Sequence, residues 1–447
     1  MGSRSAGSSG FAGKRRNAPP PSGYARSVNI EALYVHAPFC RRRCGYCDFA
    51  VTVAATADPE PWAETVAREL ASVLARAGWS VPLRPRTLYV GGGTPSLFGP
   101  AAMSWLREKL GGAVDFDSVR EWTAEANPES FDDAVAEGWA RAGVNRISLG
   151  AQTFHAPTLA WMGRLHGPEG PARALASARE AGIRNVSLDL IFAVPERLRR
   201  DWRRDLDIAS RLEPDHLSLY GLTAEEGTPL RRWIAEGRER LPEPDGYAAE
   251  YLAAAHRLAA DGWVHYEVSN FSRPGKASLH NEAYWNGSAY LGLGPGAHSY
   301  VAPRRWWNLR DWRAYRSAVT AGTSAVGDRE ILSGAEARLE RIWLGLRTRF
   351  GLALDGPRSV EVANGWVSRA LAVVDHDAMP DASPSPRRAP ATGARGGAGR
   401  VRLSAEGWLL LDRLAVEMDA AWESGEADCG HTTRGAARGA AREGIRE

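Results

Sequence analysis

The feature that most constrains the fold is a regular alternation of short apolar segments and amphipathic segments between residues 30 and 220. Such alternation is typical of parallel βαβ units with right-handed crossovers. Helical segments begin after Asp, Ser or Pro and end at Gly78, Gly143 and Gly182, as capping rules expect. The expected strands are Ala32–His36, Thr87–Val90, Glu121–Glu125, Asn145–Leu149, Asn185–Leu190 and His216–Tyr220. The expected helices are Pro61–Gly78, Pro100–Leu110, Asp132–Ala142, Pro171–Ala181 and Asp201–Leu212.

Residues that are suited to catalysis or ligand binding lie where these expected strands end. In an α/β barrel the carboxyl ends of the strands form the rim that carries the active site. Six strand–helix units, rather than the eight of a closed barrel, predict a partial, open α/β barrel. The rim residues are His36, Gly91–Gly93, Glu125, Gln152 and Asp189.

Three of the four cysteines, Cys40, Cys44 and Cys47, form a C-x3-C-x2-C array directly after the first expected strand. Thiolates are ligands of iron–sulfur clusters and of zinc. A four-iron cluster takes one ligand per iron, so three cysteines would leave one iron open. A structural zinc site needs four ligands, and His36 is the nearby candidate for the fourth. Cys429 stands alone far downstream, and this cysteine usage predicts a reducing compartment.

Composition excludes several classes of protein. The 447 residues are 44% hydrophobic and 24% charged, which is typical of a globular protein that buries a sizeable core. A net charge of +3 is too close to neutral to indicate nucleic-acid binding. No apolar run reaches the ~18 residues that span a bilayer, and no secretion signal is recognisable. We therefore expect a cytoplasmic protein that neither crosses a membrane nor binds nucleic acid.

Several further motifs follow the cysteines in a fixed order between Leu33 and Ser299. Together they resemble the radical S-adenosylmethionine (SAM) superfamily, in particular the branch of oxygen-independent coproporphyrinogen III oxidase and the haem chaperone HemW. A single cysteine array is only moderately specific, whereas an ordered series of motifs is far more so. The series is Tyr34-Val-His36-x-Pro-Phe-Cys40, Gly91-Gly-Gly-Thr94-Pro95-Ser96, Glu125-x-Asn127-Pro128, Asn145-Arg146-x-Ser148-x-Gly150-x-Gln152, Arg164-Leu-His166, Asp189, His265-Tyr-Glu267-x-Ser269-Asn270-Phe271 and His280-Asn281-x-x-Tyr284-Trp285.

The resemblance implies two cofactors and a set of residues that bind them. It places a [4Fe-4S] cluster on Cys40, Cys44 and Cys47, with SAM on the open iron. A glycine run allows close backbone approach to the methionine end of SAM. The resemblance assigns the surroundings of the cluster and SAM to Tyr34, Tyr46, Gly92, Gly93, Thr94, Glu125, Gln152, Arg164 and Asp189.

Two features favour the chaperone branch over the oxidase branch. Oxidases of this branch usually carry a fourth cysteine at the position of Phe49. The H-N-x-x-Y-W motif resembles HemW, which implies haem binding with His280 as a candidate axial ligand and Tyr284 or Trp285 stacked on the porphyrin. The leading hypothesis is a haem chaperone that delivers haem to an unidentified acceptor protein. The alternatives are an oxygen-independent coproporphyrinogen III oxidase and a zinc-stabilised binding module.

Beyond residue 241 the alternation stops, and the chain divides by composition and resemblance. The resemblance implies an α/β fold, a partial (β/α)6 barrel with a smaller, mostly helical, winged-helix-like C-terminal domain. It leaves the oligomeric state open, with a homodimer as one expectation. The expected divisions are a disordered leader at 1–29, the barrel at 30–265, a haem- or substrate-side extension at 266–330, a C-terminal domain at 331–425 with a disordered insert at 375–400, and a flexible tail at 426–447.

One segment departs from the family pattern. After Asp189 the family often reads Gly-x-Pro-x-Gln-Thr, whereas this chain has Ala193-Val194-Pro195-Glu196-Arg197-Leu198. An alanine in place of the glycine adds a Cβ beside the expected SAM site. Contacts from residues 192–197 to SAM are therefore not expected to follow the family.

Overall fold

The computed structural model of the protein describes residues 28–375 and 399–423. The leader, the insert and the tail expected from the sequence lie almost wholly outside these described residues, as does Cys429.

Six parallel strands form one half of a twelve-stranded sheet of order β14-β13-β12-β11-β1-β4-β5-β6-β7-β8-β10-β9. Their spatial order follows their order in the chain, and helices lie in the crossovers, which confirms the partial (β/α)6 barrel. Each strand begins within one residue of its predicted start. These strands are β1 (Ala32–Ala37), β4 (Thr87–Gly92), β5 (Glu121–Ala126), β6 (Arg146–Gln152), β7 (Asn185–Phe192) and β8 (His216–Gly221).

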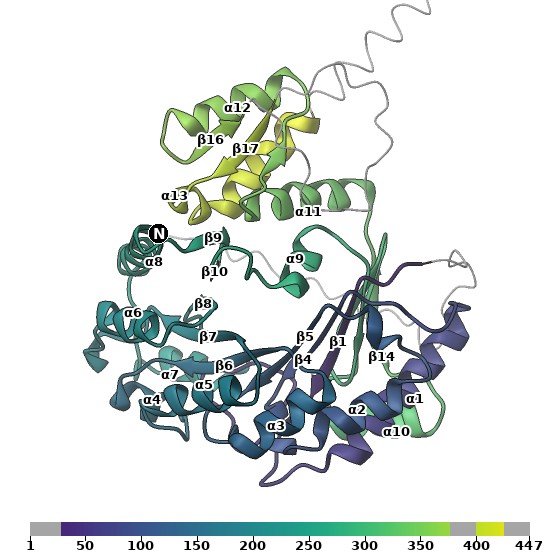
Figure 1. Ribbon diagram of the computed structural model, residues 1–447. Helices are drawn as coiled ribbons and strands as arrows, with labels where there is room; N and C mark the ends of the chain where they lie inside the picture. Colours follow the sequence, from purple (N-terminus) through teal and green to yellow (C-terminus); the bar gives the residue numbers. More distant parts are fainter. Residues whose placement is uncertain (1–27, 376–398, 424–447) are drawn as a thin grey trace, which may run out of the picture.

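Helices cover the outer face of this parallel half (Figure 1). Their ends follow the capping signals of the sequence: the Asp58 carboxylate accepts from the Glu60 N–H, and Gly78 ends the first helix at φ 66°. The helices are α1 (Pro59–Ala77), α2 (Ala102–Leu110), α3 (Asp133–Ala142), α4 (Ala156–Met162), α5 (Gly170–Glu180), α6 (Trp202–Arg211), α7 (Pro229–Ala235) and α8 (Pro244–Ala260).

The other half of the sheet is mainly antiparallel. Strand β11 (Tyr290–Leu293) pairs with β1 in parallel, and β12 (His298–Val301), β13 (Arg304–Asn308) and β14 (Val326–Ile331) follow as antiparallel neighbours. At the far end, β10 (Asn270–Ser272) and β9 (Val264–Glu267) add to β8. Helix α9 (Leu279–Trp285) precedes β11, and α10 (Trp312–Thr320) precedes β14.

The last part of the described chain forms a small unit above the sheet (Figure 1). It is mostly helical and carries its own three-stranded antiparallel sheet, which agrees with the expected winged-helix-like character. Residues 411–423 are also helical. Its elements are α11 (Gly334–Arg347), β15 (Leu352–Ala353), α12 (Pro357–Val367), β16 (Ala372–Asp375), β17 (Arg400–Leu403) and α13 (Ala405–Trp408).

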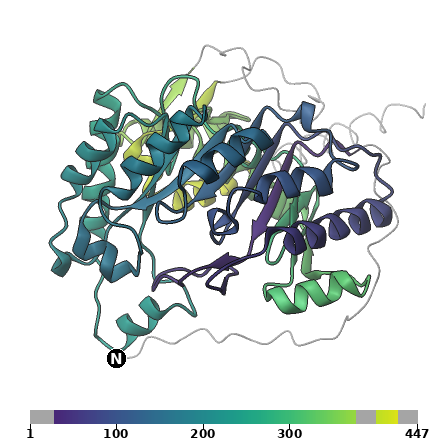
Figure 2. The same ribbon diagram turned by 60° about the horizontal axis from the view of Figure 1, so that its bottom comes forward.

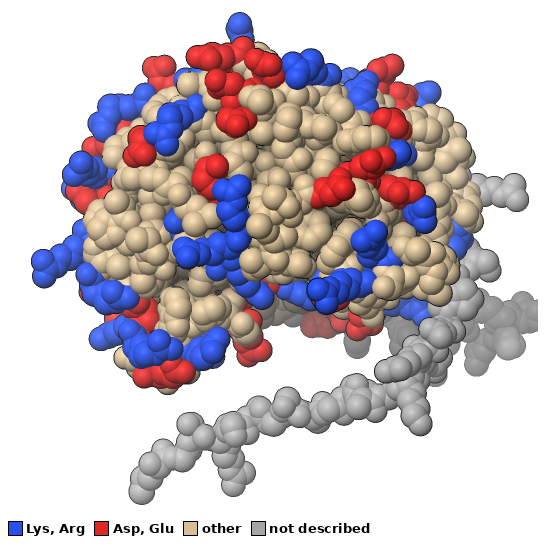
Figure 3. Space-filling view, turned by 90° about the horizontal axis from the view of Figure 1, so that it is seen from below, with Lys and Arg blue, Asp and Glu red and all other residues tan. Residues whose placement is uncertain are grey.

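The core joins segments that are far apart in the sequence. Helices α1 and α10 lie side by side (Figure 2), and Trp62 and Tyr315 are completely buried there. Figure 3 shows Lys and Arg interspersed with Asp and Glu over the face seen from below. Within the two described ranges, no helix is long and apolar enough to cross a membrane.

Candidate functional site

The three clustered cysteines lie in a loop just beyond β1. Cys40 ends the two-residue strand β2 (Phe39–Cys40), which pairs with β3 (Thr52–Val53). Cys44 and Cys47 follow in a turn closed by a hydrogen bond from the Cys47 N–H to the Cys44 carbonyl, at 3.3 Å. All three thiols are free and half-buried.

Two side chains from the barrel rim reach this loop. The Thr94 hydroxyl donates to the Cys40 Sγ at 3.3 Å, and the Arg164 Nη1 lies 4.0 Å from the Cys44 Sγ. Burial raises the pKa of the Cys40 thiol to about 11 and also raises the pKa of Cys47. Thiolates at such a site need a compensating cation, and the ferric and ferrous ions of a cluster supply one.

The zinc alternative is not supported by the position of its proposed fourth ligand. The His36 Nδ1 lies 3.1 Å from the Tyr34 hydroxyl, and its Nε2 lies 2.9 Å from the Ala50 carbonyl, so both ring nitrogens are engaged. Burial lowers the pKa of His36 to about 4. Among the described residues, no three His, Cys, Asp or Glu side chains converge as a single metal ion requires. A cluster with one cysteine per iron does not require that convergence.

The glycine run at the end of β4 packs against the first rim loop without room for side chains. A Cβ on Gly92, whose φ is 105°, would lie 2.2 Å from the His36 ring. A Cβ on Gly93 would lie 2.6 Å from the Ala37 carbonyl oxygen. These contacts explain why glycine is needed here, and Gly92 also lines the cavity described below.

Glu125, the penultimate residue of β5, is a partly buried carboxylate. It accepts from the Gly92 N–H and from the Tyr89 hydroxyl, each at 2.8 Å. Burial raises its pKa to about 7. Tyr34, from β1, stacks on Tyr89 at 6.0 Å between ring centres. Side chains and backbone of three neighbouring strands, β1, β4 and β5, thus meet in one polar group, as the sequence predicted for the rim.

Arg164 is held rigidly rather than solvated. Its Nη2 donates to the Asn127 Oδ1 at 2.6 Å and to the Gly150 carbonyl at 2.7 Å, and Asn127 in turn donates to the Thr94 hydroxyl. Asn127 was not predicted as a site residue, although it belongs to the Glu125-x-Asn127-Pro128 motif. Its amide links Arg164 to Thr94, and these two side chains contact different cysteines.

The remaining rim residues lie at the ends of β6 and β7 or beside the cysteine loop. Gln152 adopts φ 63°, a conformation that is rare for a non-glycine residue and that often marks functional sites. Both Asp189 carboxylate oxygens accept from the Ser148 hydroxyl at 3.0 Å. Burial raises the pKa of Asp189. Tyr46 packs against a small apolar cluster that includes Met162.

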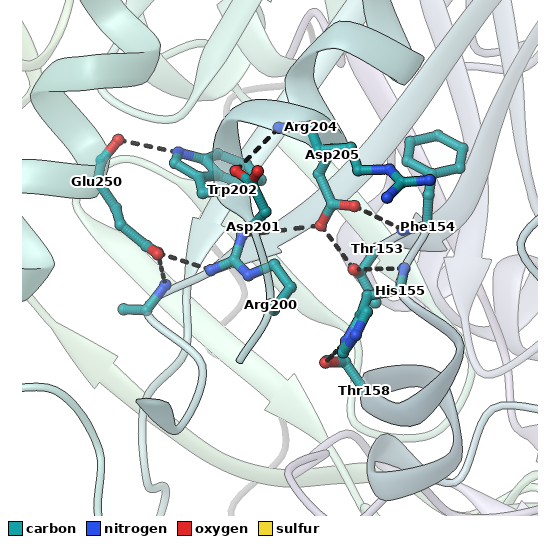
Figure 4. Close-up of polar contacts among 11 residues, drawn as sticks. Thr153, Phe154, His155, Thr158, Arg200, Asp201, Trp202, Arg204, Asp205 and Glu250 are labelled. Atoms are coloured by element: carbon teal, nitrogen blue, oxygen red, sulfur yellow. Dashed lines mark hydrogen bonds and ion pairs between the residues drawn. The ribbon is translucent and has the colours of Figure 1, made fainter. Parts of the chain in front are cut away.

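A buried ionic network supports these two strand ends (Figure 4). Arg200 pairs with Glu250 at 2.7 Å and with Asp205 at 3.7 Å, and its side chain is 1% exposed. Asp205 accepts from the Thr153 hydroxyl and the Phe154 N–H beyond β6. Glu250 accepts from the Ala193 N–H beyond β7 at 2.6 Å. No sequence signal distinguished Arg200 from the many surface arginines of this chain.

A cavity of about 990 Å³ opens from the rim toward the C-terminal unit. Tyr34, Gly92 and Glu125 lie at its barrel end, and Tyr284 and Trp285 line its wall. Phe49, two residues after Cys47, also lines it and is 56% exposed. The cavity therefore adjoins the cysteine loop, and its volume is at the upper end of the range for small-molecule sites.

His280 lies behind this cavity rather than in its lining. It is 1% exposed, its Nδ1 lies 2.8 Å from the Thr87 hydroxyl, and its Nε2 lies 2.9 Å from the Tyr284 hydroxyl. Burial lowers its pKa to about 3. In this conformation neither ring nitrogen can coordinate a bound iron. The structure thus brings Tyr284 and Trp285 to the cavity and keeps His280 in the polar core.

Comparison with known proteins gives the family. A model described as "Radical SAM superfamily" matches residues 34–209. The chain is 37% identical over 325 residues to the heme chaperone HemW of Mycobacterium tuberculosis, covering 72% of this chain and 83% of that protein. It is 30% identical to the heme chaperone HemW of Bacillus subtilis, covering 72% and 85%.

The structural comparison gives the same fold. Coproporphyrinogen III oxidase, HemN, from Escherichia coli superposes with a TM-score of 0.69 at 20% identity, covering 88% of this chain and 91% of that chain. At this identity the likeness concerns the fold alone. The sequence relatives, each matched over more than three quarters of its length, are decisive: this chain belongs to the HemW family of radical SAM proteins.

Proposed function

We propose that the protein is a haem chaperone that holds a [4Fe-4S] cluster and SAM, binds haem, and delivers it to an acceptor protein. The observation that carries this proposal is the cavity of about 990 Å³ that adjoins the cysteine loop and is lined by Tyr284 and Trp285. Aromatic and apolar walls suit a porphyrin, whose faces are apolar and whose edge carries two carboxylates. The sequence relatives, which are heme chaperones of the HemW family, support the same function.

The residues of the rim fit the two resident cofactors. Cys40, Cys44 and Cys47 would each hold one iron, with Arg164 and Thr94 beside the sulfurs. SAM would lie along the backbone from Gly91 to Gly93, where side chains are excluded. When bound and reduced, this pair of cofactors supplies a 5′-deoxyadenosyl radical.

Phe49 separates this proposal from the oxidase alternative. The resemblance expects a fourth cysteine there in coproporphyrinogen oxidases, whereas this chain exposes an apolar ring at the cavity mouth. An exposed phenylalanine offers contact area to a porphyrin face but no ligand to iron.

An anaerobic experiment distinguishes the two functions. The reconstituted protein is given haem and then apomyoglobin, and transfer is followed by the absorbance of myoglobin. In parallel, the reduced protein is given SAM and coproporphyrinogen III, and the products are analysed by chromatography. Haem binding and transfer without decarboxylation support the chaperone. Decarboxylation that disappears in Cys44→Ala would instead establish an oxidase.

We further propose a cytoplasmic location and a homodimer. Three free cysteines suit a reducing compartment. Strand β14 is the last strand of the sheet, and its Asp328 and Arg329 are exposed. Antiparallel pairing of two β14 strands would extend the sheet across two copies. Light scattering over a range of concentrations tests this: a mass of two chains is expected, and the mass of a single chain at every concentration would contradict the proposal.

The C-terminal unit is proposed as a domain that begins near residue 331. Strand β14 ends at Ile331, and the elements after it form a separate three-stranded sheet. Residues 266–330 instead extend the barrel sheet and supply one wall of the cavity.

A further inference from the structure

Two histidines line the cavity, His36 and His298, and His298 differs from the buried His280 in both exposure and hydrogen bonding. His298, the first residue of β12, is exposed and lines the cavity. Its ring stacks on Trp307 at 5.4 Å and has no hydrogen-bond partner among the described residues. An imidazole that is open to a cavity and unpaired is free to coordinate iron.

The turn before His298 is built rigidly. Gly294 and Gly296 adopt φ 96° and 70°, which side chains rarely allow. The buried carboxylate of Glu69, on α1, accepts from the Gly294 N–H at 2.8 Å and from the Asn308 amide. Asn308 also donates to the Gly294 carbonyl at 2.8 Å. The start of β12 is thus fixed from two other elements, which holds the His298 backbone in place.

A cation suited to a propionate lies near this histidine. Of the two arginines that line the cavity, Arg305 is paired with Glu330 at 2.8 Å and with Glu340 at 2.5 Å. Arg310 is exposed and donates to the Asp48 carbonyl, and no carboxylate pairs with it among the described residues. Its guanidinium retains donors for a carboxylate of the ligand.

Apolar side chains from two parts of the chain line the cavity, alongside several carboxylates. Phe49 comes from the cysteine loop, and Leu339, Trp343 and Val416 come from the C-terminal unit. The Trp285 indole N–H, also in the lining, has no hydrogen-bond partner among the described residues. A flat ligand in the cavity would bury apolar area against these side chains.

We infer that His298 is the protein ligand to the iron of the carried haem and that Arg310 pairs with a propionate of that haem. The inference rests on the proposed function. His280, the histidine of the H-N-x-x-Y-W motif, then has a structural role: it supports the cavity wall and orients the Tyr284 hydroxyl.

The test is a titration of the full-length, cluster-loaded chain with haem, followed by Soret absorption and by electron paramagnetic resonance of the ferric complex. His298→Ala is expected to weaken binding at least tenfold and to remove the spectral signature of histidine ligation. Added imidazole restores that signature in this variant. Arg310→Met is expected to weaken binding severalfold without moving the Soret band.

Two further variants complete the test. His256→Ala, at a histidine with a 67% exposed side chain outside the cavity lining, serves as a control and is expected to bind like the natural chain. His280→Gln is expected to keep the histidine signature. An unchanged spectrum in His298→Ala, with loss of the signature in His280→Gln, overturns the inference and leaves the chaperone function intact. A natural chain that binds no haem overturns both.

Discussion

The two halves of the twelve-stranded sheet offer different polar side chains to the cavity and the cysteine loop. In the parallel half, Glu125, Arg164 and Arg200 are each held by two or more hydrogen bonds or ion pairs. In the antiparallel half, His298 and Arg310 face a cavity with much of their bonding capacity unused.

The difference matches two kinds of task. Resident cofactors need a fixed geometry, which a network of mutually bonded side chains provides. A cargo that must also leave needs ligands that are accessible and that have few competing partners. The following predictions test whether the two halves are as separate as this comparison suggests.

The largest expected effect separates the cluster from the cargo. Cys44→Ser removes a soft ligand and is expected to abolish the iron–sulfur absorbance, because the remaining two cysteines hold too few irons. Haem affinity, measured by titration under argon, is expected to stay within tenfold of the natural value. Loss of haem binding together with the cluster would show that the two halves form one site.

The next effect compares buried and half-exposed arginines. Arg200→Met leaves Asp205 and Glu250 without their buried cation and is expected to cost ~3–5 kcal/mol of unfolding free energy. Arg305→Met, in the antiparallel half with a 26% exposed side chain, is expected to cost about 1 kcal/mol or less. Urea denaturation of both variants measures the difference.

A surface control keeps this comparison interpretable. Arg203, the second residue of α6, is exposed, and Arg203→Met is expected to leave the free energy of unfolding unchanged. Equal losses in Arg200→Met and Arg305→Met would contradict the distinction between the two halves.

An intermediate effect concerns acid stability. His280 has a folded pKa of about 3 because it is buried, against 6.5 for an unfolded histidine. The unfolded chain therefore binds a proton that the folded chain excludes, so stability is complete above pH 6.5 and falls as the pH decreases toward 3. The loss is about 1.4 kcal/mol per pH unit for one proton.

His280→Gln removes this titration. Its unfolding free energy is expected to fall less steeply with pH between 6 and 4.5, by about one proton, when both chains are denatured with urea at each pH. His256→Gln, at an exposed position, provides the control slope. A slope identical to that of the natural chain would mean that His280 already binds protons in the folded state and is more accessible than its burial indicates.

The smallest effect concerns the strand end that departs from the family. Ala193 adopts φ 57° beyond β7, where the family often has glycine. Ala193→Gly is expected to stabilise the chain by about 1 kcal/mol, because glycine adopts this conformation without steric cost. Ala151→Gly, in strand β6 and outside the left-handed region, is expected to destabilise it by a similar amount. Thermal denaturation of both variants decides between these signs.

The parallel half was predictable because its signals are local. The predicted segments Asn185–Leu190 and Asp201–Leu212 correspond to the observed Asn185–Phe192 and Trp202–Arg211. Strands β11 to β14 were not predicted individually, because they lie beyond residue 241, where the regular alternation of apolar and amphipathic segments stops. Their partners are set by tertiary packing, which a single sequence does not reveal.

The site was predictable by residue type and only in part by position. The motifs identified the cysteines, Thr94 and Arg164, which the structure brings together. They also singled out His280, but a motif carries no information on burial. Arg200 was not identified, because its sequence context does not show that it is buried and because Glu250, one of its two partners, lies 50 residues away.

The cysteine loop connects the cluster site directly to the cavity. Cys47 belongs to the cluster site and Phe49 to the cavity, with only Asp48 between them. A cluster held by Cys47 would therefore be joined to the Phe49 ring at the cavity by a single intervening residue. Thermodynamic linkage is reciprocal. If the assembled cluster changes the affinity for haem by some factor, bound haem changes the affinity for the cluster by the same factor. Binding of haem and binding of the cluster would then be coupled through the segment Cys47-Asp48-Phe49.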